Sequence, residues 1–265
     1  MIASLRRVLA LGVMILVTAV MAPMQVLVLK SGMVDPGRLP RLWHRILVKA
    51  IGLRIHAHGS LIEKRPLLVA CNHVSWTDIM VLGSLVDVTF IAKADLAGWP
   101  VFGFLAGLQR TLFVERERRG RAGTQAGEIA GRLAGNEAVV LFAEGSTGDG
   151  NHLLPFKSTL FGAARMALSG AGATVYIQPV AIAYTKLHGM PMGRQHRQLA
   201  AWIGDSELVP HLFSLIGEGA IDVEVRFGAA RAFTAESDRK LVARQVEQDV
   251  RRMLWAALSA RPDLG

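Results

Sequence analysis

Two stretches of the sequence combine residue types that can transfer protons or hold a polar ligand. The first runs from Asn72 to Asp78 (NHVSWTD) and lies between the apolar runs PLLVA and IMVLGSL. This pattern predicts a strand that ends near Cys71 and a helix that begins near Ser75, a junction where α/β proteins often place their chemistry. If Asp78 accepts the Nδ1 proton of His73, Nε2 is left to act as a general base.

Two simpler interpretations of these residues stay open. Ser75 and Asp78 have the spacing of a capping box, in which the carboxylate satisfies a helix terminus. His73 could be a loop histidine that bonds only to backbone groups. Spacing alone does not decide between a structural and a catalytic role.

The second stretch is FAEGSTGDGNHLLPFKS, which begins at Phe142. An apolar strand, 139–143, runs directly into a loop whose glycines let backbone N–H groups approach a ligand closely. An ordinary strand-to-helix loop would look the same, and the Gly-Lys-Ser/Thr of a nucleotide P-loop is absent.

Short apolar runs alternate with helical patterns over the rest of the chain. Strands are expected at 54–59, 66–71, 88–93, 111–116, 138–145, 175–183 and 222–227, and helices near 76–86, 96–108, 118–134, 157–169 and 235–257. This alternation predicts an α/β fold, with a sheet covered by helices on both faces. The single cysteine, Cys71, excludes an internal disulfide and a cysteine-rich metal site.

The N-terminal region predicts contact with a membrane. No charged residue occurs from Val8 to Leu29, which is long enough to span a bilayer. A retained anchor, a helix broken at Pro23 that only dips into the membrane, and a cleaved signal peptide are all compatible with this run. The stretch RLPRLWHRILVKAIGL then predicts a basic amphipathic helix. We therefore expect a membrane anchor and amphipathic helix at 1–52 and an α/β domain at 53–265.

Composition supports the same setting. Hydrophobic residues make up 51% of the chain and the net charge is +9, a combination that suits an anionic membrane surface. Nucleic acid is not an expected partner, because the basic residues are not interleaved with aromatic ones. More basic residues follow the apolar run than precede it, which places the main domain on the cytoplasmic side of an inner membrane.

The motifs, taken in order, resemble those of the glycerolipid acyltransferases typified by the bacterial 1-acylglycerol-3-phosphate acyltransferase. That family shows Asn-His-x4-Asp, a Phe-x-x-Arg block, Phe-Pro-Glu-Gly-Thr-Arg, and a later proline block. Here the corresponding segments are NHVSWTD, FVER (Phe113 to Arg116), FAEGST (Phe142 to Thr147) and IQPVAI (Ile177 to Ile182). The sequence around these motifs most resembles that of a subfamily that acylates lyso-ornithine lipid.

The resemblance implies a mixed α/β sheet of the glycerol-3-phosphate acyltransferase type and acyl transfer to a lysolipid hydroxyl. The donor would be a thioester cosubstrate, either acylated acyl-carrier protein or acyl-CoA. The resemblance implies no metal and no resident cofactor. His73 would act as the general base and Asp78 would hold its imidazole. The residues expected to bind the acceptor are Lys93, Arg116, Glu144, Gly145, Ser146, Thr147 and Lys157.

One departure from the family pattern bears on the acceptor. Thr147 stands where the family usually has the arginine of Glu-Gly-Thr-Arg, so a bidentate grip on a phosphate is missing. This favours phosphate-free lyso-ornithine lipid over lysophosphatidic acid. A 1-acyl-sn-glycerol-3-phosphate acyltransferase that makes phosphatidic acid remains the alternative.

Two other classes of protein fit parts of the sequence. A hydrolase could use Cys71 or a serine as its nucleophile, and Cys71 and His73 could face the same side of a strand end. A membrane-bound lipid carrier could keep the fold without turnover.

Three further histidines, His188, His196 and His211, lie in a Pro/Gly-containing region. They either line the entrance to the acceptor site or are ordinary loop residues.

Overall fold

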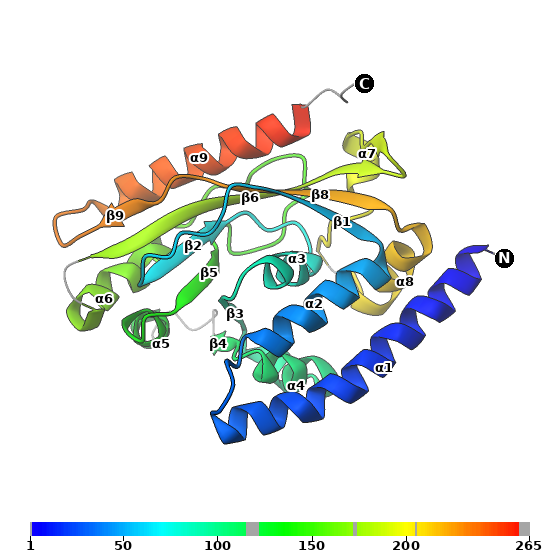
Figure 1. The fold of residues 1–265 in the computed structure, drawn as a ribbon. Coiled ribbons are helices and arrows are strands. Elements are labelled where there is room, and N and C mark those ends of the chain that lie inside the picture. The colour runs from blue at the N-terminus through cyan, green and yellow to red at the C-terminus, as the bar shows by residue number, and fades with distance from the viewer. Residues whose placement is uncertain (1, 115–121, 172–173, 205, 260–265) are drawn as a thin grey trace.

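The structure is a computed structural model that describes residues 2–114, 122–171, 174–204 and 206–259. Within these ranges the strands form a nine-stranded sheet (Figure 1). Its main path runs through β1 (Leu53–His58), β8 (Ile221–Phe227), β6 (Val175–Leu187), β2 (Leu67–Cys71), β5 (Ala138–Phe142), β3 (Thr89–Lys93) and β4 (Leu112–Val114). The two short strands β7 (Met190–Pro191) and β9 (Arg231–Phe233) both pair with β6.

The sheet is mixed, as the sequence predicts. β6, β2, β5, β3 and β4 are parallel neighbours, whereas β8 runs antiparallel to β6. The central strands β2 and β5 are buried along their whole length, because helices cover both faces of a parallel sheet. Their continuous apolar sequences follow from that double burial.

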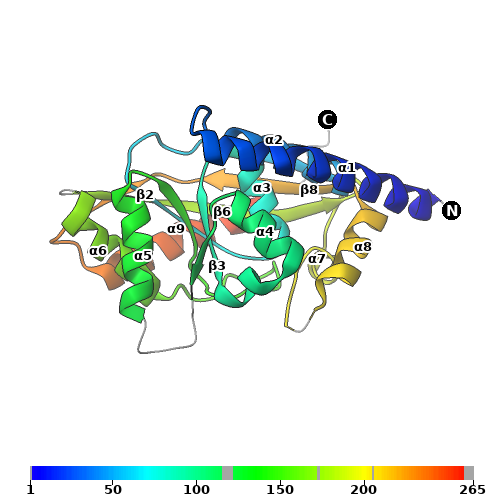
Figure 2. The same cartoon turned by 90° about the horizontal axis from the view of Figure 1, so that it is seen from below.

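Helices cover the two faces in two groups (Figures 1 and 2). The core on one face is completed by α2 (Arg38–Ile51), α3 (Thr77–Leu85) and α8 (Leu208–Glu218). The core on the other face is completed by α5 (Ala122–Ala134), α6 (Gly162–Ala171) and α9 (Arg239–Ser259). The expected two-sided cover is confirmed.

The N-terminal helix α1 (Ile2–Ser31) packs along the domain beside α2, α4 (Pro100–Leu108) and α8. The Trp43 indole donates to the Thr18 hydroxyl at 2.9 Å, and the Arg7 guanidinium donates to the carbonyl of Phe213 at 3.0 Å. Pro23 lies inside the continuous helix, so the alternative of a helix broken there is wrong. The helix is long and apolar enough to cross a membrane, although one of its faces is held by the domain.

Most predicted elements are present, with their ends shifted by a few residues. The end of the strand expected at 111–116 and the start of the helix expected near 118–134 lie outside the described residues. The helix expected near 96–108 is divided into the 3-10 turn η1 (Ala94–Gly98) and α4, and that near 157–169 into η3 (Ser158–Phe161) and α6. The sequence missed α7 (Arg194–Arg197) and α8 in the region 186–219. Pro210 made a helix at α8 look unfavourable from the sequence. It lies in the first turn, however, where a helix tolerates proline.

Candidate active site

The two polar stretches meet because they follow neighbouring parallel strands. β2 and β5 are paired with Cys71 opposite Phe142, so the turn after β2 and the glycine-rich loop after β5 leave the same edge of the sheet. The His73 ring stacks on Phe142 with ring centroids 3.9 Å apart and an interplanar angle of 15°. This stacking fixes the plane of the imidazole.

His73 and Asp78 form the pair that their spacing suggested. The Nδ1 of His73 lies 2.9 Å from Oδ2 of Asp78, whose side chain is fully buried in the first turn of α3. The same oxygen accepts the backbone N–H groups of Val74 at 2.7 Å and Ser75 at 2.9 Å. The helix-capping and histidine-orienting interpretations are therefore both realised by one carboxylate.

The other oxygen of Asp78 is held by a residue that the sequence did not single out. The Tyr184 hydroxyl donates to Oδ1 at 2.8 Å. Burial, together with the nearby Asp78 charge, raises the pKa of Tyr184 well above its usual range, so the phenol stays a proton donor. Tyr184 reaches this level because β6 continues beyond the end of β2, where Cys71 is paired with Val180.

Asn72 ties the turn from Asn72 to Asp78, which we call the catalytic turn after its candidate base, to the same strand. Its side-chain amide donates to the carbonyl of Ile182 at 2.9 Å and accepts the N–H of Ile182 at 2.8 Å. With both hydrogen bonds made to one backbone unit, Asn72 cannot rotate without losing both. The turn that carries His73 is thus anchored at its start by Asn72 and at its end by Asp78.

The second nitrogen of His73 is available for chemistry. Its side chain is 17% exposed, and no hydrogen bond from Nε2 to any described residue is present. Since Asp78 accepts at Nδ1, the neutral tautomer carries its proton there and Nε2 keeps a lone pair. The geometry is that of a general base with an orienting carboxylate.

Glu144 lies behind the turn as a buried support. Its Oε1 accepts the backbone N–H of His73 at 3.2 Å, while Oε2 is buried with no partner among the described residues. Burial raises the pKa of Glu144 to about 8, with smaller contributions from the charges of Asp78 and Asp149. Its expected contact with the acceptor stays a prediction.

The remaining expected binding residues are placed as follows. Gly145 adopts a left-handed conformation (φ +73°) beneath the Lys157 side chain, which would touch a Cβ there. Ser146 and Lys157 are exposed, and Lys93 is exposed at the end of β3, the strand beside β5. Arg116 lies outside the described residues.

Thr147 has a structural contact that the sequence did not predict. Its hydroxyl donates to the carbonyl of Trp202 at 2.5 Å. The hydroxyl proton is therefore already committed, and a head group could use only the lone pairs of that oxygen. The position that carries arginine in the wider family here joins two segments of the chain.

The thiol alternative finds no support in this arrangement. Cys71 is completely buried at the end of β2, and burial raises the pKa of its thiol well above the usual range. A thiol that stays protonated and sealed from the substrate is a poor nucleophile. Elsewhere, the described residues contain no group of three or more histidine, cysteine or acidic side chains able to hold a metal ion.

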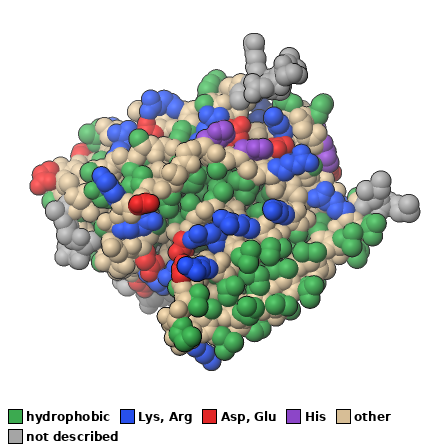
Figure 3. All heavy atoms as spheres, in the orientation of Figure 1, with side chains coloured by type: hydrophobic (Ala, Val, Ile, Leu, Met, Phe, Trp, Pro, Cys, Tyr) green, Lys and Arg blue, Asp and Glu red, His purple; other side chains and the backbone are tan. Residues whose placement is uncertain are grey.

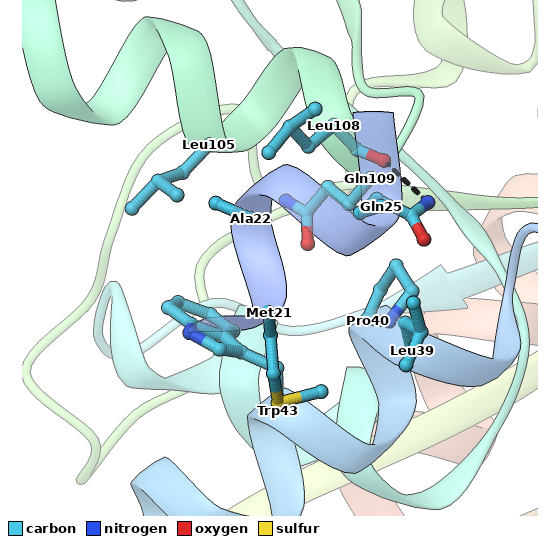
Figure 4. A pocket seen from close by; sticks show the side chains of 9 residues that line it. All are labelled: Met21, Ala22, Gln25, Leu39, Pro40, Trp43, Leu105, Leu108 and Gln109. Atoms are coloured by element: carbon cyan, nitrogen blue, oxygen red, sulfur yellow. Dashed lines mark hydrogen bonds between the residues drawn. The ribbon is translucent and has the colours of Figure 1, made fainter. Parts of the chain in front are cut away.

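A separate pocket lies between α1, α2 and α4 (Figure 4). The residues that line it are Met21, Ala22, Gln25, Leu39, Pro40, Trp43, Leu105, Leu108 and Gln109. The Gln25 amide closes one side by donating to the carbonyl of Leu108 at 3.0 Å. None of these residues belongs to the catalytic turn or to the glycine-rich loop, so the pocket is not the candidate active site.

Comparison with known proteins assigns the class. Residues 53–183 match the family model described as Acyltransferase, and this chain belongs to the acyltransferase family. The lyso-ornithine lipid O-acyltransferase of Brucella abortus is 52% identical over 98% of both chains. The protein of the same description from Rhizobium meliloti is 49% identical, over 94% of this chain and 85% of its own.

A solved structure agrees with the fold. The crystal structure of the 1-acyl-sn-glycerophosphate acyltransferase PlsC from Thermotoga maritima matches with a TM-score of 0.62. The match covers 98% of this chain and all of that one, at 17% sequence identity. At this identity the likeness extends to the fold alone.

Proposed function

We propose that this protein is a membrane-associated O-acyltransferase that moves a fatty acyl group from a thioester donor to the hydroxyl of lyso-ornithine lipid. The observation that carries the proposal is the 2.9 Å contact between His73 Nδ1 and the fully buried Asp78 carboxylate, which leaves Nε2 free. The names and high identities of the two bacterial relatives support the choice of acceptor.

The chemistry follows from the protonation pattern of the histidine. His73 Nε2 takes the proton of the acceptor hydroxyl while the oxygen attacks the carbonyl carbon of the thioester. Asp78 stabilises the imidazolium that forms, because its carboxylate already accepts the Nδ1 proton. The tetrahedral intermediate then expels the thiolate, which takes the proton back from Nε2. The two substrates react directly, so the enzyme itself is not acylated.

The acceptor is inferred from what the glycine-rich loop offers a head group. Thr147 supplies no charge and donates its proton to Trp202, while Asp149 lies in the same loop. For a dianionic phosphate the loop has no arginine to bind it, and the nearby carboxylate of Asp149 would repel it. A zwitterionic amino-acid head group carries an ammonium as well as a carboxylate, which suits a loop with both signs of charge nearby.

The membrane surface is proposed from the outer face of α1. Figure 3 shows hydrophobic side chains gathered over this helix, bordered by lysine and arginine side chains. The exposed large apolar residues of α1 are Leu5, Val8, Leu9, Val13, Ile15, Leu16, Val20, Met24, Leu27 and Leu29. Because the other face of α1 packs on the domain, we place α1 along the membrane interface, with the catalytic domain on the cytoplasmic face of the inner membrane.

Purified protein in mixed micelles tests the acceptor. Lyso-ornithine lipid and lysophosphatidic acid are offered together. In one reaction the donor is acyl-carrier protein that carries a labelled acyl group, and in the other it is acyl-CoA with the same label in its acyl group. Label in ornithine lipid supports the proposal, and the faster donor identifies the cosubstrate. Label that enters only phosphatidic acid would overturn the choice of acceptor while keeping the acyltransferase chemistry.

A further inference from the structure

The segment from Met192 to Trp202 connects the two loops of the candidate active site. The Trp202 backbone N–H donates to the carbonyl of Val74 at 2.9 Å, next to His73. The Trp202 carbonyl accepts the hydroxyl proton of Thr147 in the glycine-rich loop at 2.5 Å. One backbone unit thus holds the catalytic turn and the glycine-rich loop together.

Arg197 lies at the centre of this segment and is 7% exposed. Its Nη1 donates to Oδ1 of Asn151 in the glycine-rich loop, and its Nη2 donates to the carbonyl of Met192 at 2.7 Å. The Asn151 amide donates in return to the carbonyl of Arg194 at 3.1 Å. Burying a guanidinium is costly, so the two hydrogen bonds hold it in one arrangement, and the one to Asn151 ties the glycine-rich loop to the segment.

The stem of Arg197 also reaches the catalytic turn through a glycine. A Cβ at Gly150 would lie 3.1 Å from Val74 Cγ1 and 3.4 Å from Arg197 Cγ. Gly150 has a φ of +72°, which a side chain would strain. Because Gly150 has no side chain, Val74 and the stem of Arg197 can both pack close to its backbone.

His211 of α8 links the segment to Trp76, the residue that precedes α3. The Trp76 indole donates to Nδ1 of His211 at 2.9 Å, and His211 Nε2 lies 3.1 Å from the carbonyl of Leu199. Because Nδ1 accepts a hydrogen bond from Trp76 and Nε2 donates to a carbonyl, His211 is neutral and carries its proton on Nε2. His211 therefore connects the start of α3, at Trp76, with the segment.

We propose that Arg197 is a positioning residue that holds the glycine-rich loop in register with the catalytic turn. The inference rests on the proposed function, because the loop is assigned to the acceptor head group there. The Arg197 guanidinium belongs to a segment that is distant in sequence, and it contacts a loop that has Thr147 where the family usually has an arginine. Since both of its terminal nitrogens bond to protein oxygens, Arg197 acts on the acceptor through the loop.

The test compares Arg197→Met and Arg197→Lys with Arg194→Met. Arg194 belongs to the same short helix, its side chain is exposed, and its hydrogen bond with the loop is made by its backbone carbonyl. The assay determines kcat and the KM values of acceptor and donor separately, in micelles of one composition. We expect Arg197→Met to raise the acceptor KM by about tenfold, the effect of one lost charge-assisted hydrogen bond, and to lower kcat. The donor KM should stay unchanged, and Arg194→Met should match the wild type.

Variants of Asn151 keep the test decisive if Arg197→Met does not fold. Asn151→Asp retains an oxygen that accepts from Arg197, whereas Asn151→Ala does not. The alanine variant should raise the acceptor KM, and the aspartate variant should raise it less, because aspartate keeps the acceptor for Arg197 although it loses the donor to Arg194.

Two results would overturn the inference. One is Arg197→Met kinetics equal to those of Arg194→Met. The other is a lower kcat with both KM values unchanged, which is what a smaller folded fraction produces. A wild-type enzyme that acylates only lysophosphatidic acid would overturn the proposed acceptor instead, and the same variants would then be compared on that lipid.

Discussion

The buried carboxyl of Glu144 predicts an unusual dependence of stability on pH. Its pKa is raised from the ordinary 4.5 to about 8, mainly by burial. Between these values the folded protein holds a proton that the unfolded chain has released. The stabilisation is therefore complete below pH 4.5, falls as the pH rises, and is lost once the pH passes about 8.

The size of the effect follows from the shift. Each pH unit inside the window removes about 1.4 kcal/mol from the free energy of unfolding, which amounts to about 3 kcal/mol between pH 4.5 and pH 7. Glu144→Gln keeps an oxygen that can accept the N–H of His73 and removes the ionisation. The Gln variant should therefore gain about 6–12 °C in Tm relative to the wild type over this range.

Thermal unfolding of both proteins in one detergent, from pH 5 to pH 8, measures this difference. Using the matched variant cancels the contributions of all other ionisable groups, which both proteins share. The two Tm curves should converge near pH 5 and separate steadily towards pH 8. Curves that stay parallel over the whole range would refute the reasoning, because Glu144 would then titrate like an exposed carboxyl.

Three further substitutions address the catalytic turn. Asp78→Asn should lower kcat on the order of a thousandfold, since an amide can donate to His73 Nδ1 and favour the wrong tautomer; steady-state kinetics of the folded variant check this. Tyr184→Phe removes the donor to Asp78 Oδ1 and should lower kcat about tenfold with little change in KM, so an unchanged kcat would show that this hydrogen bond is dispensable. Cys71→Ala should keep its rate and lose about 1 kcal/mol of stability in denaturant unfolding, whereas an inactive but folded variant would restore the thiol mechanism.

Local patterns in the sequence were sufficient to predict the parts of the site that lie within one connection. His73 and Asp78 are separated by a single turn, so their spacing already suggested the contact that the structure contains. The meeting of the two loops was not predicted, because it depends on the order of the strands: β2 and β5 are neighbours and end at the same edge of the sheet.

Contacts between distant segments were not predictable in this way. Tyr184 reaches Asp78 only because β6 continues past the end of β2, and strand lengths relative to one another are not written in any local pattern. Arg197 read as one more basic residue in a Pro/Gly-containing region, although it is buried against Asn151. The contact of α1 with the domain was hidden for a related reason, since an apolar helix that packs on one face resembles one that crosses a bilayer.

The central claim is that His73 is the general base of acyl transfer. The most direct measurement compares wild-type protein with a folded His73→Ala variant, using a labelled thioester donor and lyso-ornithine lipid, and follows label into ornithine lipid. The account predicts transfer by the wild type and a loss on the order of a thousandfold or more in the variant. Transfer by His73→Ala at a rate close to that of the wild type would contradict it.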